Sequence, residues 1–274
     1  LPGLREKAEA VREACTRLRF HEALRRRIPE AAAESRVRGA RASAALDGAD
    51  YPVDLVRELT TGARSWPEDL SPDLATLKGA IAATAESERV AAIVRTAPLQ
   101  ALARLHVAAA SPLVDPDRTA VLGRPRTPGE DSAELVDLGP APQAAEVSRR
   151  LAQLADLVVA ASAATNRVPA VVISSVVHGE ILSIRPFVHG NGLVARAMER
   201  ALVQALGLDP TGVAVPEAGH VANGAVTYTG SSAAYGTGSA AGVGLWLGQA
   251  ADALLNGAVE GERICDAVRA GRLT

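Results

Sequence analysis

The loop-and-helix stretch that ends at Arg196 constrains this chain most, because a short glycine-bearing loop leads directly into a segment of strong helix-forming composition. Gly190 and Gly192 permit unusual backbone angles, and backbone N–H groups crowd together at such a junction. The dipole of the following helix adds partial positive charge at the same point. We therefore expect Gly190, Asn191 and Gly192, with Arg185 and Arg196 nearby, to form a cradle for a phosphate or pyrophosphate.

Helical patterning dominates the rest of the sequence. Aromatic residues make up only 3%, while Ala, Leu, Val and Arg are abundant, which favours helices with small side chains at their contacts. The segment 168–183 is apolar on most sides and is expected to be the buried central helix, although its β-branched residues would also permit a buried strand. The predicted fold class is all-α, with helices over residues 4–27, 29–47, 52–59, 69–95, 98–110, 144–165, 168–183, 190–206, 245–255 and 262–270.

Two regions depart from this pattern. Residues 111–142 contain many prolines and glycines, and two short strand-like pieces, 120–122 and 134–136, flank a Pro-Gly turn. The sequence therefore predicts a small β-hairpin, over about 119–142, inserted between helices. Residues 217–244 are rich in Gly, Ser, Thr and Ala, and are expected to form a mobile rim or a poorly formed helix.

Composition and charge exclude several function classes. The formal net charge of −2 gives no reason to expect a nucleic-acid partner or an anionic membrane. No uninterrupted apolar run of about 18 residues or more occurs, and no secretory leader is recognisable. Cys15 and Cys265 lie near opposite ends without metal-type spacing, so idle thiols in a reducing compartment are expected. These features predict a cytoplasmic protein, and the strong preference for Arg over Lys suggests a bacterial one.

The loop carries a specific motif. The family pattern is H-P-F-x-[D/E]-G-N-G-R-x-x-R, and the residues of this chain that match it are Pro186, Phe187, Gly190, Asn191, Gly192 and Arg196. The chain thereby resembles the Fic (Fido) family. The resemblance implies a Fic-type helical bundle over residues 61–274, in which the 119–142 hairpin is the flap that docks a target protein. Residues 1–60 would form an N-terminal helical region.

A second signature lies in that N-terminal region. Some Fic proteins carry an autoinhibitory helix with the pattern [S/T]-x-x-x-E-[G/N], and Ser43, Asp47 and Gly48 fit it if Asp replaces Glu. The resemblance implies that Asp47 pairs with Arg196 and that an inhibitory helix spans about 29–48. The alternative is an ordinary helix end in which Gly48 is the C-cap.

The motif also departs from the family at its reactive positions. Fic proteins transfer AMP from ATP to a hydroxyl, but the base position here is Arg185, which cannot accept a proton near neutral pH. The metal-holding acid is replaced by His189, a poor ligand for Mg²⁺, so no metal site is expected. The first motif arginine is replaced by Leu193, which removes a phosphate contact.

Histidines are the remaining candidates for proton transfer. His189 lies in the loop, four residues after Arg185, and could act as a relocated base. His178 is on the apolar helix, where a hydrogen-bonded structural role is the better interpretation. Two tyrosines of the glycine-rich segment could stack on a base or simply pack. These tyrosines are Tyr228 and Tyr235. No role is assigned to the other histidines, which are His21, His106 and His220.

Three functions follow from these residues. The leading hypothesis is a binding or regulatory module that responds to a small phosphate-bearing ligand such as ATP or ADP, without adenylyl transfer by the family route. The rival is a divergent transferase that uses His189 as its base. The third is an interaction protein with an empty site. Nothing in the sequence indicates an oligomeric state.

Overall fold

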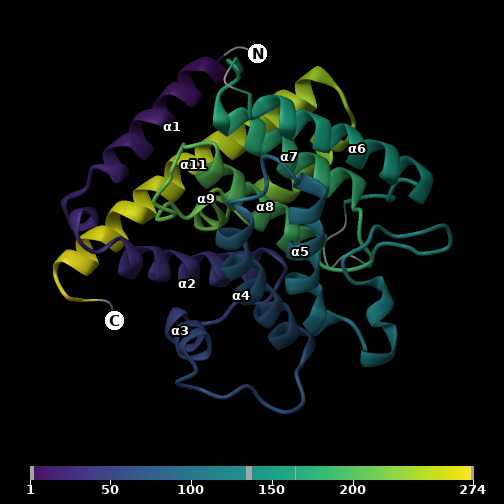
Figure 1. Cartoon of the computed structure of the whole chain (residues 1–274), viewed down its shortest axis with the longest axis horizontal. Coiled ribbons are helices and arrows are strands. Elements are labelled where there is room, and N and C mark those ends of the chain that lie inside the picture. Colours follow the sequence, from purple (N-terminus) through teal and green to yellow (C-terminus); the bar gives the residue numbers. More distant parts are fainter. Residues whose placement is uncertain (1–2, 134–137, 164, 273–274) are drawn as a thin grey trace.

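The computed structural model describes residues 3–133, 138–163 and 165–272 (Figure 1). Helices account for the regular structure of this part of the chain, and it contains no strand. The helices are α1 (Leu4–Arg19), α2 (Ile28–Leu46), α3 (Val53–Thr61), α4 (Pro72–Val90), α5 (Pro98–Ala110), α6 (Ala144–Ala161), α7 (Ala170–Ile184), α8 (Asn191–Ala205), α9 (Pro216–Ala222), α10 (Ala225–Gly236) and α11 (Ala240–Arg269). Three short 3₁₀ turns are η1 (Glu22–Arg25), η2 (Ser111–Leu113) and η3 (Pro116–Val121). The all-α fold class is confirmed.

Local sequence explains where many of these helices begin. Pro72 and Pro98 open α4 and α5, where a missing backbone N–H costs nothing. Ser71 caps α4 by accepting from the Leu74 N–H, and Ser239 caps α11 by accepting from the Gly242 N–H. The prediction of a helix over 98–110 matches α5 at both ends.

The centre of the molecule is the pair α7 and α8, joined by the motif loop. Every residue of α8 from Asn191 to Val203 is buried, and α7 packs along it. Helices α4 and α5 pack on α8, while α10 and the long helix α11 pack on α7 (Figure 1). Helix α1 and the end of α11 share a second apolar cluster, which contains both cysteines, Cys15 and Cys265. The division at residue 60 remains a prediction. Helix α2 packs in the same main apolar cluster as α8.

The glycine-rich segment is better ordered than the sequence suggested. Instead of a mobile rim, residues 217–244 form most of α9, all of α10 and the start of α11. A Cβ at Gly219 would collide with the carbonyl oxygen of Ala253, and one at Gly242 with that of Ala234. These glycines therefore let helices approach closely.

The first and last predicted helices differ from the observed ones in their boundaries. The two predicted C-terminal helices are one continuous helix, α11, and a Cβ at Gly257 or Gly261, inside it, would press on the Val215 carbonyl or on Leu18. The first predicted helix instead ends at Arg19, and the chain turns through Phe20 and His21 into η1.

The predicted hairpin is not seen in the part of the flap that the structure describes. Ala120 and Val121 lie in the 3₁₀ turn η3, with Leu122 after it, and the second predicted strand lies outside the described residues. The flap also bonds to the motif loop: the Arg126 N–H donates to the Pro186 carbonyl (2.8 Å), and the Ala133 N–H donates to the Val188 carbonyl (2.7 Å). Backbone groups that pair with the loop need no partner strand.

Candidate functional site

The motif loop between α7 and α8 is held in a fixed shape by its own backbone and by the flap. Arg185 ends α7 in the left-handed region (φ 43°, ψ 69°), where few non-glycine residues lie. Its carbonyl accepts from the Arg126 side chain (2.7 Å), and its guanidinium donates to the carbonyls of Gly139 (2.6 Å) and Pro140 (2.7 Å). The Arg185 side chain thus points to the flap, and it is not among the residues that line the cavity described below.

Asn191 closes the loop from inside. Its Oδ1 accepts from the Phe187 N–H (2.8 Å), and its Nδ2 donates to the Phe187 carbonyl (2.8 Å). The side chain is fully buried, and its oxygen and nitrogen both bond to the loop backbone. Its own backbone N–H remains one of the first donors of α8.

His106, to which sequence reasoning gave no role, supports this loop from α5. Its ring stacks on Phe187, with centroids 3.8 Å apart and planes 10° from parallel. Its Nδ1 accepts from the Gly123 N–H (3.0 Å). Burial lowers the pKa of His106 to about 4, so the ring is neutral and can accept this bond. No sequence spacing links residues 106, 123 and 187, so the contact could not have been predicted.

A cavity of about 720 Å³ opens in front of the N-terminus of α8. From the loop and α8, it is lined by His189, Gly190, Gly192, Leu193 and Arg196. Its other walls include the end of α2, Tyr228 of α10, and parts of the segments 68–76 and 112–116. Its size is within the range of small-molecule sites. The carboxylates on its lining are Asp47, Glu68, Asp69 and Asp115.

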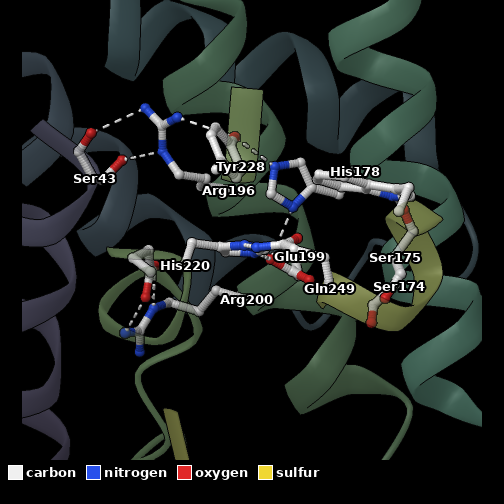
Figure 2. Close-up of polar contacts among 12 residues, drawn as sticks. Ser43, Ser174, Ser175, His178, Arg196, Glu199, Arg200, His220, Tyr228 and Gln249 are labelled. Atoms are coloured by element: carbon white, nitrogen blue, oxygen red, sulfur yellow. Dashed lines mark hydrogen bonds and ion pairs between the residues drawn. The ribbon is translucent and has the colours of Figure 1, made fainter. Parts of the chain in front are cut away.

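Arg196, which lines this cavity, is held by Ser43, Asp47 and Tyr228, and Figure 2 shows its bonds to Ser43 and Tyr228. Its Nε donates to Ser43 Oγ (2.8 Å), and one terminal nitrogen donates to the Ser43 carbonyl (3.0 Å) and to Asp47 Oδ2 (2.8 Å). The other terminal nitrogen donates to the Tyr228 hydroxyl (3.2 Å). Burial alone would lower the pKa of Arg196, but the Asp47 carboxylate raises it, so the guanidinium stays charged. The expected Asp47–Arg196 contact is confirmed.

Gly48 and Gly192 behave differently from each other. Gly48 follows the end of α2 with φ 90°, so it is a left-handed residue after a helix, as the C-cap interpretation expects. Gly190 has φ 76°, whereas Gly192 has an ordinary helical φ and does not use the backbone freedom that glycine permits. Gly192 is needed for space instead: a Cβ there would lie 2.9 Å from Asp47 Oδ1 and 3.1 Å from a terminal nitrogen of Arg196.

The two other exchanged motif positions line the cavity. Leu193 presents an apolar side chain where the family has an arginine. His189 is half-buried, and desolvation, with a smaller effect from Arg118, lowers its pKa. His189 is therefore largely neutral at pH 7 and can accept a proton. It does not fit Mg²⁺, which requires oxygen ligands at this position.

Behind Arg196 lies a buried polar cluster, which Figure 2 also shows. His178 Nδ1 and His220 Nε2 each lie 2.9 Å from Glu199 Oε2, and His178 Nε2 lies 2.9 Å from the Tyr228 hydroxyl. Gln249 Nε2 lies 3.2 Å from His220 Nδ1. The prediction of a hydrogen-bonded, buried His178 is confirmed, whereas His220 was missed because nothing in the sequence links it to His178.

Charge in this cluster follows from burial. Desolvation lowers the pKa of His178, so its ring is neutral. Burial acts to raise the pKa of Glu199, but the two histidines outweigh it and lower that pKa to about 2. Glu199 is thus a buried carboxylate that two imidazoles face.

The arrangement of these helices is that of known proteins. No family model matches the sequence, and no curated protein matches it. A Fic family protein from Desulfovibrio desulfuricans G20 superposes on the chain with a TM-score of 0.68, 21% identity, and coverage of 99% of this chain and 74% of that one. This chain has the Fic fold. Fic-1 from C. elegans aligns with a TM-score of 0.67 at 15% identity, with coverage of 98% and 73%.

A third Fic-fold structure aligns with this chain over nearly the whole length of both proteins. It is a Fic domain containing signaling protein from Bacteroides thetaiotaomicron VPI-5482, with a TM-score of 0.65, 12% identity, and coverage of 95% of this chain and 98% of that one. The Fic fold therefore accounts for the whole helical arrangement around the motif loop. Within the described residues, none of the helices has both the length and the apolar character needed to cross a bilayer.

Proposed function

We propose that this Fic-fold protein is a regulatory binding module whose ligand carries phosphate groups, such as ADP or ATP, and that it does not transfer adenylyl groups by the family route. The observation that carries the proposal is the Asp47–Arg196 pair, which lies inside the cavity at the N-terminus of α8. In the resting chain, Asp47 holds the arginine that the ligand needs. Displacing the carboxylate frees Arg196 and the first N–H groups of α8 for an anion.

The loss of adenylyl transfer rests on the three exchanged positions. Arg185 cannot act as a base, and its guanidinium is bonded to flap carbonyls. His189 does not fit Mg²⁺, and Leu193 offers no charge to a phosphate. The binding chemistry that remains uses backbone N–H groups and one arginine, which suffices to hold an anion without activating it.

The flap gives this module an output. Its Arg126 and Ala133 N–H groups bond to the carbonyls of Pro186 and Val188, so a change in the loop on ligand binding reaches the flap surface directly. A target protein docking at residues 119–142 would sense that change. Hydrogen exchange of the 126 and 133 amides should slow or quicken at least about threefold when ADP binds, whereas amides of α1 should not change.

Calorimetric titration of ADP and ATP tests whether Asp47 competes with the ligand for Arg196. The chain with Asp47→Asn should bind at least about tenfold more tightly than the unchanged chain, because ligand no longer competes with a carboxylate for Arg196. Asp50→Asn is the matched control, since Asp50 pairs with Arg41 at the surface near the same helix end. Absence of heat and of any thermal shift for Asp47→Asn at millimolar ADP would refute the proposal.

One observation favours a second function, a divergent group transferase. His189 lines the cavity in a largely neutral state, so its imidazole could take the proton of an attacking protein hydroxyl while the hydroxyl oxygen displaces the leaving group at phosphorus. Incubating Asp47→Asn with nucleoside triphosphates or CDP-choline and a cell lysate separates the two functions. A mass increase on any protein that His189→Ala abolishes would establish the transferase and overturn the binding-module proposal.

A further inference from the structure

The buried cluster behind Arg196 brings three metal-ligating side chains together. His178 comes from α7, Glu199 from α8 and His220 from α9, and one ligand atom of each lies within 4.8 Å of the others. All three side chains are fully buried. We propose that these residues bind one divalent transition-metal ion, with Zn²⁺ as the reference ion, through His178 Nδ1, His220 Nε2 and the Glu199 carboxylate.

Two orphan atoms argue for an ion rather than for hydrogen bonds alone. Both imidazoles converge on Glu199 Oε2, and Glu199 Oε1, equally buried, has no hydrogen-bond partner. Gln249 Oε1 is also buried without one. Buried polar atoms without partners are rare, and an ion is one of their ordinary explanations. A carboxylate that binds a metal through both oxygens would satisfy Oε1 and complete a set of two nitrogens and two oxygens.

The spacing suits such an ion. Each imidazole nitrogen lies 2.9 Å from Glu199 Oε2, which is close to the separation of about 3.3 Å expected for two ligands at tetrahedral angles and bond lengths of about 2.0–2.1 Å. Imidazole and carboxylate together suit Zn²⁺ and Fe²⁺ better than Mg²⁺ or Ca²⁺. Small shifts of side chains would therefore admit the ion.

The outer atoms of both histidines also have partners that fix the required tautomers. A metal on His220 Nε2 leaves the proton on Nδ1, and turning the Gln249 amide by half a turn places its orphan Oε1 to accept that proton. A metal on His178 Nδ1 likewise leaves the proton on Nε2, which lies 2.9 Å from the Tyr228 hydroxyl. Each ring changes tautomer and stays neutral, so no net proton is released.

The ion would be felt in the cavity through Tyr228. Without metal, the Tyr228 hydroxyl donates to His178 Nε2 and accepts from Arg196. With metal, His178 donates instead, so the Tyr228 O–H must turn to another acceptor, and Tyr228 lines the cavity. Metal occupancy is therefore expected to change the hydrogen bonding of the Arg196 clamp, in addition to supporting the core.

Metal analysis of the whole chain tests this inference. Because the site is fully buried, the protein should acquire its ion during folding, so cells are grown with added Zn²⁺ and the purified chain is analysed by mass spectrometry for bound metals. We expect about one equivalent in the unchanged chain and a loss of at least about tenfold in Glu199→Gln. The matched control is Glu34→Gln, a buried carboxylate of α2 that pairs with Arg38 and Arg57, and it should keep the metal.

A second measurement avoids reliance on variants that fail to fold. The unchanged chain is unfolded, stripped with a chelator and refolded with Co²⁺ or Zn²⁺. A visible Co²⁺ absorption band of a four-coordinate site, and a Tm at least about 5 °C above that of chain refolded in chelator, are expected. Less than about a tenth of an equivalent of metal in both preparations, or full metal retention by folded Glu199→Gln, would overturn the site. Neither readout depends on nucleotide binding.

Discussion

Arg196 and Arg200 lie one turn apart on α8 and are held by nearly the same set of partners. Arg196 bonds to the side chain and carbonyl of Ser43 on α2, and Arg200 bonds to the side chain (3.0 Å) and carbonyl (3.3 Å) of Ser35, two turns earlier on that helix. Each arginine also has one carboxylate. Asp47 gives Arg196 a single bond, whereas Glu217 gives Arg200 two, of 2.8 and 2.9 Å.

The difference between the two clamps lies in the acid. The Glu217 side chain is 1% exposed, while that of Asp47 is 15% exposed and borders the cavity. A doubly bonded, fully buried pair can only be broken by leaving a charge without compensation. A singly bonded pair at a cavity can be opened by a ligand or by water. Burial of the acid therefore separates a structural ion pair from one that a ligand can open.

The largest effect is expected from breaking the closed clamp. Glu217→Gln leaves Arg200 charged and buried, so the free energy of unfolding should fall by about 3–5 kcal/mol. Urea unfolding measures this loss. A change below about 1 kcal/mol would mean that the Arg200 clamp is as open as that of Arg196.

Beyond its serine and its acid, Arg196 donates to the Tyr228 hydroxyl (3.2 Å), whereas Arg200 has a longer contact with the Gly212 carbonyl (3.5 Å). Tyr228→Phe removes the hydroxyl that bridges Arg196 and His178, and leaves His178 Nε2 buried without a partner. The free energy of unfolding should fall by about 2 kcal/mol, an intermediate effect. Urea unfolding measures this loss. The control is Tyr235→Phe, which removes a partly buried hydroxyl that has only long contacts.

Breaking the Asp47–Arg196 pair should have a smaller effect on stability. Asp47→Asn should cost about 1–2 kcal/mol of unfolding free energy, because Arg196 keeps Ser43 and Tyr228 and faces a cavity that solvent can enter. Urea unfolding of Asp47→Asn and Glu217→Gln under the same conditions compares the two losses of unfolding free energy. If both variants lose the same free energy, the distinction drawn between the two clamps is incorrect.

The effect that is smallest at neutral pH concerns His106 and the loop that precedes both arginines. The pKa of His106 falls to about 4 in the folded chain, against about 6.5 when unfolded, so the unfolded chain binds more protons between these values. Stability should therefore fall as the pH drops from about 6.5 to about 4. His106→Gln should reduce that slope in Tm-versus-pH measurements without abolishing it, because burial also lowers the pKa of His178. An unchanged slope would contradict the assignment.

Local signals in the sequence predicted much of this molecule. Periodicity and proline positions located α5 and the central helices, since these depend on residues close in sequence. The motif resemblance predicted the fold and the Asp47–Arg196 contact, because a family pattern encodes long-range geometry. Its regulatory role remains a prediction.

Features that depend on distant parts of the chain could not be predicted. The direction of the Arg185 side chain is set by carbonyls of Gly139 and Pro140, more than forty residues earlier. The helices α9 and α10 depend on glycines that fit against neighbouring backbone. The cluster of His178, Glu199 and His220 arises only when three helices pack, and no spacing in the sequence announces it.

A substitution at Gly192 offers a way to disturb the Asp47–Arg196 pair sterically. Because its φ is an ordinary helical one, alanine suits the backbone there and should even favour the helix, yet the added methyl carbon would sit 2.9 Å from Asp47 and 3.1 Å from Arg196. The lighter and more exposed partner, the carboxylate, would be pushed aside. One methyl group would thereby separate Asp47 from Arg196 without changing any charge in the protein.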